Sequence, residues 1–272
     1  MGFVADKLFR LREAATLISR YAADGQTRRT LVEIYRSLSR PETYDEPRDL
    51  RLKVGRETFA FRMRLSDIFI LGEILFEQQY AMQSPLPAKP MIIDAGGNIG
   101  ISGLWFAGHH PDARMHIFEP ASENLVYLEE NARHWPGAQV FKQALGAQSG
   151  EMALYMGAFG GMHSLMEDAP ETGAAQEVVP VVTLKEHMAT HGIARVDLLK
   201  LDVEGGEMAA LIGLGDRIGD VSVIVGEVHE AIIDTDAFYA YLRDYGFRVL
   251  WTKRFHGSEE QQVHGFEAAR IS

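Results

Sequence analysis

Apolar residues recur at the spacing of an amphipathic helix in two early segments, FVADKLFRLREAATLISRYA and TRRTLVEIYRSL. The turn-rich stretch PETYDEPRD separates them from LRLKVGRETFAFRMRL, where residues alternate on either side of a glycine, as in a β-hairpin. A further helical stripe lies in SDIFILGEILFEQQYAM, and QSPLPAKP has the composition of a linker. We therefore expect a helical and hairpin extension over residues 1–65.

Short apolar runs alternate with helical stripes from Met91 onward. The expected strands are MIIDAG, RMHIFEP, AQVFKQALG, EMALYMG, VVPVV, VDLLKLDVEG, VSVIVGEVHE, FRVLWTKR and VHGFEAARI. Strands that alternate with helices of this length predict an α/β fold, with a mostly parallel sheet covered on both faces. The last two strands have no helix between them and should form an antiparallel hairpin. Residues 66–272 are expected to make up this domain.

Composition narrows the function classes. The chain has 272 residues and a formal net charge of -11. An acidic surface argues against nucleic acid or an anionic membrane as the main partner, because both are bound largely through Lys and Arg. The sequence lacks an apolar run long enough to span a membrane. It contains no cysteine, which fits a reducing compartment, and we expect a cytoplasmic protein.

Ligands of doubly wound sheets bind at the carboxyl ends of the strands. The polar residues at these ends are Asp94, Glu119, Gln143, Asp202 and Glu227. The first strand runs into IIDAGGNIGISG, a glycine-rich turn of the form D-x-G-x-N-x-G. This departs from the G-x-G-x-x-G fingerprint of dinucleotide-binding proteins, which disfavours an NAD-dependent oxidoreductase.

The acids around this turn suit a cofactor without phosphate. Asp94 precedes the first glycine by two residues and could pair with an amino-acid ammonium group. Glu119 follows Gly100 by 19 residues and ends the next strand, where an acid can bind both hydroxyls of a ribose. A ribose joined to an amino acid describes S-adenosylmethionine.

With these motifs the sequence resembles the FkbM-type family of class I S-adenosylmethionine-dependent methyltransferases, over about residues 65–255. The resemblance rests on IIDAGGNIG, IFEPASENLVYLEEN, QALGAQSGEMALY, GGMHSL, VPVVTLKEHM, VDLLKLDVEGGE and GEVHE. It implies a seven-stranded sheet with a reversed final hairpin (a Rossmann-like fold). It also implies methyl transfer, mostly to oxygen of sugars, polyketides or lipid-linked glycans.

The cofactor site is expected at the ends of the first four strands of this fold. Its expected residues are Asp94, Gly96, Gly97, Asn98, Gly100, Glu119, Pro120, Gln143, Ala144 and Asp202. Asn98 could also cap the helix after the turn, and Ser122 and Asn124 could cap the next helix.

A hydroxyl acceptor needs somewhere to send its proton, and two solutions fit the sequence. In one, a histidine acts as general base, with His229 the first candidate and His163 the second. In the other, a divalent metal held by Asp202 and Glu227 lowers the pKa of the acceptor. We favour the metal-free solution, because two carboxylates on neighbouring strand ends are more often hydrogen-bonded than metal-bound.

Three questions stay open at this level. For the loop GAFGGMHSLMEDAPETGAAQ, residues 157–176, we favour a lid that orders over the site on substrate binding, and the alternative is a disordered insertion. The N-terminal extension could cap the acceptor pocket or form a homodimer interface. An N-methyltransferase of small molecules and a non-catalytic nucleotide-binding scaffold remain alternatives to the O-methyltransferase.

Overall fold

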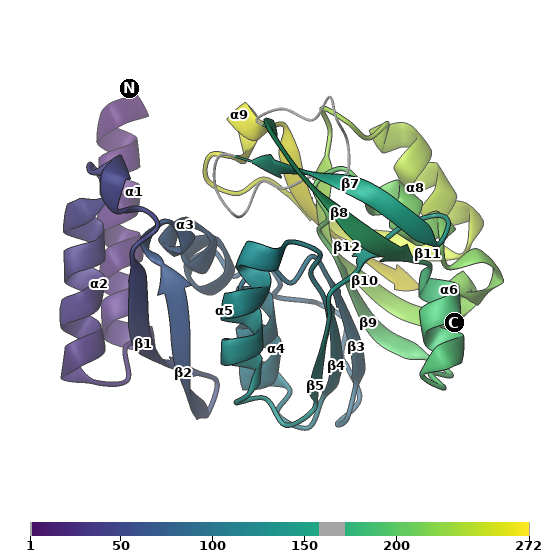
Figure 1. Cartoon of the computed structure of the whole chain (residues 1–272), viewed down its shortest axis with the longest axis horizontal. Helices are drawn as coiled ribbons and strands as arrows, with labels where there is room; N and C mark the ends of the chain where they lie inside the picture. Colours follow the sequence, from purple (N-terminus) through teal and green to yellow (C-terminus); the bar gives the residue numbers. More distant parts are fainter. Residues whose placement is uncertain (1, 158–171, 272) are drawn as a thin grey trace.

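The computed structural model describes residues 2–157 and 172–271. The N-terminal part contains, in order, α1 (Gly2–Thr16), the π-helical turn η1 (Leu17–Tyr21), α2 (Gly25–Ser37), the 3-10 turn η2 (Pro41–Thr43), the strands β1 (Pro47–Val54) and β2 (Glu57–Arg64), the 3-10 turn η3 (Leu65–Asp67), α3 (Ile68–Leu71) and the π-helical turn η4 (Gly72–Phe76). The expected hairpin is confirmed, since β1 and β2 pair antiparallel. Figure 1 shows α1 and α2 side by side at one end of the molecule.

Seven strands form the central sheet. They are β3 (Met91–Ala95), β4 (Arg114–Phe118), β5 (Ala138–Phe141), β9 (Val196–Leu201), β10 (Val221–His229), β11 (Phe247–Lys253) and β12 (Val263–Arg270). Their order is β11-β12-β10-β9-β3-β4-β5. The five strands from β10 to β5 run parallel, and β12 lies antiparallel between β10 and β11. The predicted fold class and the reversed final hairpin are therefore confirmed.

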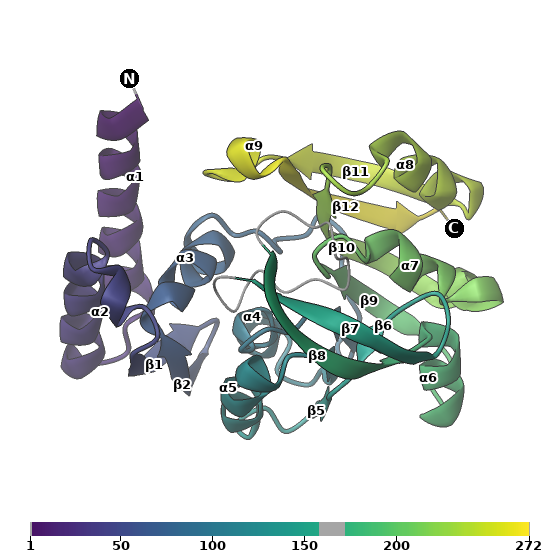
Figure 2. The ribbon, with the colours of Figure 1, turned by 45° about the horizontal axis from the view of Figure 1, so that its top comes forward.

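The two faces of the sheet are covered by different helices. These are α4 (Ile101–His109), α5 (Ser122–Ala132), α6 (Leu184–Thr190), α7 (Glu207–Ile212), the 3-10 turn η5 (Gly215–Asp220), α8 (Thr235–Asp244) and the short α9 (Ser258–Gln261). One apolar cluster packs α4 and α5 on the first face, and another packs α6, α7 and α8 on the second. Figure 2 shows α7 beside β10 and α8 beside β11.

The N-terminal extension shares the core of the first face. Leu17, Leu31 and Leu52 belong to the same buried cluster as Leu104 of α4 and Leu125 of α5. The apolar cluster thus contains residues from both sides of the predicted boundary at residue 65. The division into an extension over residues 1–65 and a domain over residues 66–272 stays a prediction. Among the helices of residues 2–157 and 172–271, none combines the length and hydropathy required to span a lipid bilayer.

The third expected strand is split in two. The chain leaves the central sheet at Phe141, whose carbonyl accepts hydrogen bonds from the amides of Glu119 and Gln143. It then forms β6 (Ala144–Leu145), which joins β7 (Gly150–Gly157) and β8 (Thr172–Val182) in a small separate sheet. The alternation of apolar residues across AQVFKQALG predicted a single strand, because the turn at Gln143 contains neither Gly nor Pro.

Candidate active site

A cavity of about 760 Å³ opens at the carboxyl ends of β3, β4, β9 and β10. Neighbouring strands β3 and β9 lead into crossovers that leave in opposite directions along the sheet, which is where doubly wound folds bind ligands. Residues of η4 and of the loop before β12 also line the cavity. Its volume lies in the upper part of the usual range for ligand sites, roughly 300–1,000 Å³.

The glycine turn borders one end of the cavity and depends on close backbone contacts. Gly96 has a φ of 81°, and a Cβ at this position would lie 1.8 Å from the carbonyl oxygen of Asp202. Gly100, with a φ of 97°, occupies the N-cap of α4. The expectation that Asn98 caps this helix is wrong, since its Oδ1 accepts a hydrogen bond from the Ile99 amide within the turn.

Asp94 lies behind the turn and does not line the cavity. Its side chain is fully buried, with Oδ2 accepting a hydrogen bond from the Ser102 hydroxyl at 2.6 Å. Its Oδ1 lies 3.3 Å from Nζ of Lys200, which donates in turn to the carbonyl of Gly96 at 2.6 Å. Direct contact between Asp94 and a cofactor stays a prediction. In the structure Asp94 instead holds Lys200, which in turn holds the backbone of the glycine turn.

The sequence analysis did not identify Lys200 as a site residue. Its signal was a lysine between two leucines near the end of the strand VDLLKL. A buried lysine normally has a carboxylate partner, and Lys200 lies near two, at 3.3 Å from Asp94 and 3.4 Å from Asp202. It therefore links the glycine turn after β3 to the end of β9.

Glu119 faces the cavity at the end of β4. Its Oε2 accepts a hydrogen bond from the Asn98 amide at 2.8 Å, and its Oε1 accepts one from the Ala121 amide at 2.9 Å. Burial raises the pKa of this carboxyl to about 7, while the backbone hydrogen bonds oppose the increase. The carboxylate is thus held by the backbone in the position from which a ribose could be bound.

Four more of the expected cofactor residues line the cavity: Gly97, Pro120, Gln143 and Ala144. The two helix caps expected after Glu119 are wrong. Ala121 occupies the N-cap of α5, and the Ser122 hydroxyl donates to Glu177. The Asn124 side chain instead bridges Arg64 and Glu119. Sequence spacing could not anticipate these partners, because Glu177, Arg64 and Glu119 all lie outside the helix.

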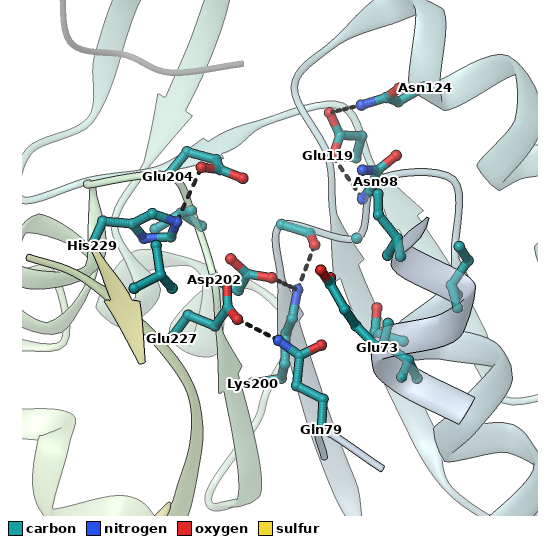
Figure 3. Close-up of a pocket in the computed structure, with 18 of the residues that line it drawn as sticks. Glu73, Gln79, Asn98, Glu119, Asn124, Lys200, Asp202, Glu204, Glu227 and His229 are labelled. Atoms are coloured by element: carbon teal, nitrogen blue, oxygen red, sulfur yellow. Dashed lines mark hydrogen bonds and ion pairs between the residues drawn. The ribbon is translucent and has the colours of Figure 1, made fainter. Parts of the chain in front are cut away.

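Asp202 and Glu227 are brought together by β9 and β10, as predicted. The Tyr80 hydroxyl donates to Oδ2 of Asp202 at 3.0 Å. The Gln79 side chain donates to Oε1 of Glu227 at 2.5 Å. Burial raises the pKa of Glu227 well above its ordinary value, and repulsion from Asp202 adds to the increase. Figure 3 shows both carboxylates on the side of the cavity opposite Glu119.

His229 lies between two other carboxylates. Its Nδ1 is 2.8 Å from Oε1 of Glu207, and its Nε2 is 3.1 Å from Oε2 of Glu204. Burial lowers the pKa of the ring, but the two glutamates outweigh burial and raise this pKa well above its ordinary value. A protonated ring with both nitrogens engaged cannot accept another proton, so the geometry argues against His229 as the general base.

The positions of Asp202, Glu227 and His229 also show whether these residues could bind a metal ion. Oxygen or nitrogen atoms of Asp202, Glu227 and His229 lie within 4.8 Å of one another, as a metal site would require. However, both ring nitrogens of His229 already face carboxylates, and the Glu227 carboxylate accepts from Gln79. A metal would have to displace these partners.

Some predicted features lie outside the described residues. They are His163 and most of the expected lid, which fall within residues 158–171. The base role of His163 and the lid both stay predictions.

Sequence reasoning missed the contribution of the segment before the linker. Glu73 of η4 lines the cavity, together with Gln79 and Tyr80. Figure 3 shows the Glu73 side chain directed into the cavity toward Lys200 and Asp202. The only available signal was the acidic residue within the apolar stripe of SDIFILGEILFEQQY.

Comparison with known proteins assigns the family. A family model described as "Methyltransferase FkbM domain" matches residues 94–249, more than half of the chain. The chain belongs to the FkbM methyltransferase family. It is thus an S-adenosylmethionine-dependent methyltransferase, and the predicted family and enzyme class are confirmed.

Similar proteins cover most of the chain. A 31-O-demethyl-FK506 methyltransferase FkbM of Streptomyces tacrolimicus is 29% identical over 230 residues, which cover 72% of this chain and 88% of the relative. Methyltransferase 1 of Beauveria bassiana is 30% identical over 202 residues, which cover 66% of this chain and 81% of the relative. A solved methyltransferase FkbM of Methylobacillus flagellatus KT is similar in fold, with a TM-score of 0.52 at 17% identity. That match covers 97% of this chain and 60% of the solved chain.

The cavity fits the cofactor of this family. At the glycine turn the backbone itself forms the wall, because a side chain at Gly96 would collide with Asp202. Next to it, the Glu119 carboxylate lines the cavity, where an acid could accept hydrogen bonds from ribose hydroxyls. The acidic side chains of Asp202, Glu204 and Glu227 line this part of the cavity, and a bound cation would favour their charged forms.

Proposed function

We propose that the protein transfers a methyl group to a hydroxyl oxygen of a neutral small molecule, such as a sugar, a polyketide or a lipid-linked glycan. The relative from Streptomyces tacrolimicus is named for methylating 31-O-demethyl-FK506, which is consistent with an oxygen acceptor. The observation that carries the proposal is the combination of carboxylates and apolar side chains around one cavity.

The cofactor end and the acceptor end of the cavity differ in chemistry. We place S-adenosylmethionine, which supplies an electrophilic methyl group on a positively charged sulfur, along Gly96–Gly100 and Glu119. Phe69, Ile70 and Ile74 also line the cavity and would contact an apolar part of the acceptor. The two ends meet at Asp202 and Glu227, which we expect to face the reacting atoms.

The carboxylates favour a neutral acceptor. Glu73, Asp202, Glu204 and Glu227 line the cavity, whereas Lys200 is occupied by backbone carbonyls and by Asp94. A carboxylate or phosphate on the acceptor would add to the repulsion that already raises the pKa values of Glu73 and Glu227. A hydroxyl can instead donate a hydrogen bond to a carboxylate, which orients its oxygen for attack.

The chain's own residues would hold the reacting groups in place. Tyr80 fixes Asp202, and Gln79 fixes Glu227, so neither carboxylate is free to rotate away. Lys200 ties the glycine turn to the end of β9. Such fixed positioning is the main requirement of an in-line displacement.

An N-methyltransferase is the second candidate, because the acidic cavity would also bind an ammonium group. The two are distinguished with labelled S-adenosylmethionine and a panel of neutral hydroxyl acceptors and amines, the products being identified by mass spectrometry and NMR. We expect label on a hydroxyl oxygen. Label on nitrogen alone would contradict O-methylation, and transfer only to anionic acceptors would contradict the neutral class.

A further inference from the structure

Glu73 is a carboxylate that the fold directs into the cavity without giving it a partner. It belongs to η4, a π-helical turn that spans Gly72–Phe76. Turns of this type are rare and occur frequently at functional sites. No hydrogen bond or ion pair to the Glu73 side chain occurs within residues 2–157 and 172–271. Its neighbours Asp202 and Glu227 have donors in Tyr80 and Gln79.

The surroundings of Glu73 suit a proton acceptor. Burial raises the pKa of its carboxyl to about 8, and the charges of Glu77, Asp202 and Glu13 add to the increase, whereas Arg10 opposes it. Glu73 and Glu227 also repel each other. A general base is most effective when its pKa is close to the working pH.

The other candidates are already engaged. His229 has a carboxylate at each ring nitrogen, and Glu119 accepts hydrogen bonds from two backbone amides. We propose that Glu73 is the catalytic base that accepts the proton of the acceptor hydroxyl. This inference rests on the proposed O-methyltransferase function.

The proton transfer balances. As the acceptor oxygen takes the methyl group, its O–H bond breaks and its proton passes to a carboxylate oxygen of Glu73, while the electron pair of the broken C–S bond stays on sulfur. Glu73 then releases the proton to solvent through the open side of the cavity, and no further reactant is required.

The first test uses a hydroxyl acceptor found in the panel. Glu73→Gln keeps the shape but cannot take a proton, so kcat should fall by roughly 10²–10⁴-fold with cofactor affinity nearly unchanged. The wild-type rate should rise with pH through the pKa of Glu73 and flatten above it, and Glu73→Gln should lack this rise. Glu73→Asp should recover part of the rate. The matched control is Glu33→Gln on the exposed side of α2, which should behave as the wild type.

A second test needs no acceptor. A cation bound in the cavity favours the deprotonated carboxylate, so S-adenosylmethionine binding near neutral pH should release protons from Glu73. Calorimetry in buffers of different ionisation enthalpy measures this release. We expect less release in Glu73→Gln than in the wild type, and a smaller difference with S-adenosylhomocysteine, whose sulfur is neutral.

The outcomes separate the two proposals. Equal proton release in both proteins, or a Glu73→Gln variant with normal kcat and pH profile, would overturn the role of Glu73. If the wild type binds the cofactor but methylates no neutral hydroxyl, the acceptor class fails while proton release still decides on Glu73. A wild type that does not bind S-adenosylmethionine would overturn both.

Discussion

The Arg64 guanidinium donates a hydrogen bond to Oδ1 of Asn124 at 2.8 Å, joining the end of the N-terminal hairpin to α5. The other end of the Asn124 amide donates to Oε1 of Glu119 at 3.4 Å. Arg64 also forms a buried ion pair with Asp67 at 3.1 Å. The hairpin is therefore connected through two side chains to the carboxylate that we expect to bind ribose.

Replacing Arg64 by Met should destabilise the fold and weaken cofactor binding together. The change leaves Asp67 buried without its cation, which typically costs about 3–5 kcal/mol. Arg62→Met, on the same strand, removes only partly exposed ion pairs with Asp49 and Glu130 and should cost less than about 1 kcal/mol. Urea unfolding measures the stability of the two variants. Similar losses in the two variants would contradict the connection described here.

Glu119→Ala should weaken S-adenosylmethionine binding by at least roughly tenfold, about 1.4 kcal/mol, because ribose hydroxyls would lose their acceptor. Calorimetric titration measures the affinity, with circular dichroism to show that the fold is intact. Unchanged affinity in a folded variant would remove Glu119 from the cofactor site.

Gly96→Ala should disrupt the turn, because its positive φ costs a side chain roughly 1–3 kcal/mol before the collision with Asp202 is counted. We expect a lower melting temperature and loss of cofactor binding. Gly150→Ala is the control, since a Cβ there meets no atom within 4 Å in the described part of the chain. A Gly96→Ala variant that binds the cofactor normally would show that the turn tolerates a side chain.

Removal of divalent cations should leave activity unchanged. Oδ2 of Asp202, Oε1 of Glu227 and both ring nitrogens of His229 already have protein partners, which a metal would have to share or displace. The measurement is methyl transfer after treatment with EDTA and dialysis. Loss of activity that Mg²⁺ restores would instead assign a metal to Asp202 and Glu227.

Acid should destabilise the protein through two buried histidines on the second face of the sheet. Nδ1 of His116 lies 2.8 Å from Nε2 of His187, and burial lowers the two pKa values to about 4 and about 3. The folded state thus binds these protons more weakly than the unfolded chain does. Stability is fully present above the unfolded pKa, about 6.5, and is lost as the pH falls toward the folded values.

The loss between neutral pH and about pH 5 should be on the order of 1 kcal/mol or more for this pair. Urea unfolding at several pH values measures it. The double variant His116→Phe, His187→Phe should lose less stability over the same range. An equal loss would assign the acid sensitivity to other groups.

Most of the fold and the glycine turn could be predicted from local periodicity and from the polar residues at the strand ends. Alternation of strands and helices, the D-x-G-x-N-x-G turn and the acid at position 119 are all written within short windows of sequence. The same windows misled on the caps at Asn98, Ser122 and Asn124. Each of these side chains could satisfy a nearby amide, and nothing local says that it does not.

The sequence by itself determined the fold class, the reversed hairpin and the edge of the sheet that holds the site, because these follow from patterns that repeat over a few residues. Only the tertiary structure decided which charges meet. Tyr80 and Asp202 are 122 residues apart, and Gln79 and Glu227 are 148 residues apart. It also placed carboxylates at both nitrogens of His229, and it left Glu73 facing the cavity with no partner among residues 2–157 and 172–271. Electrostatic environment depends on distance and burial in space, which sequence spacing does not encode.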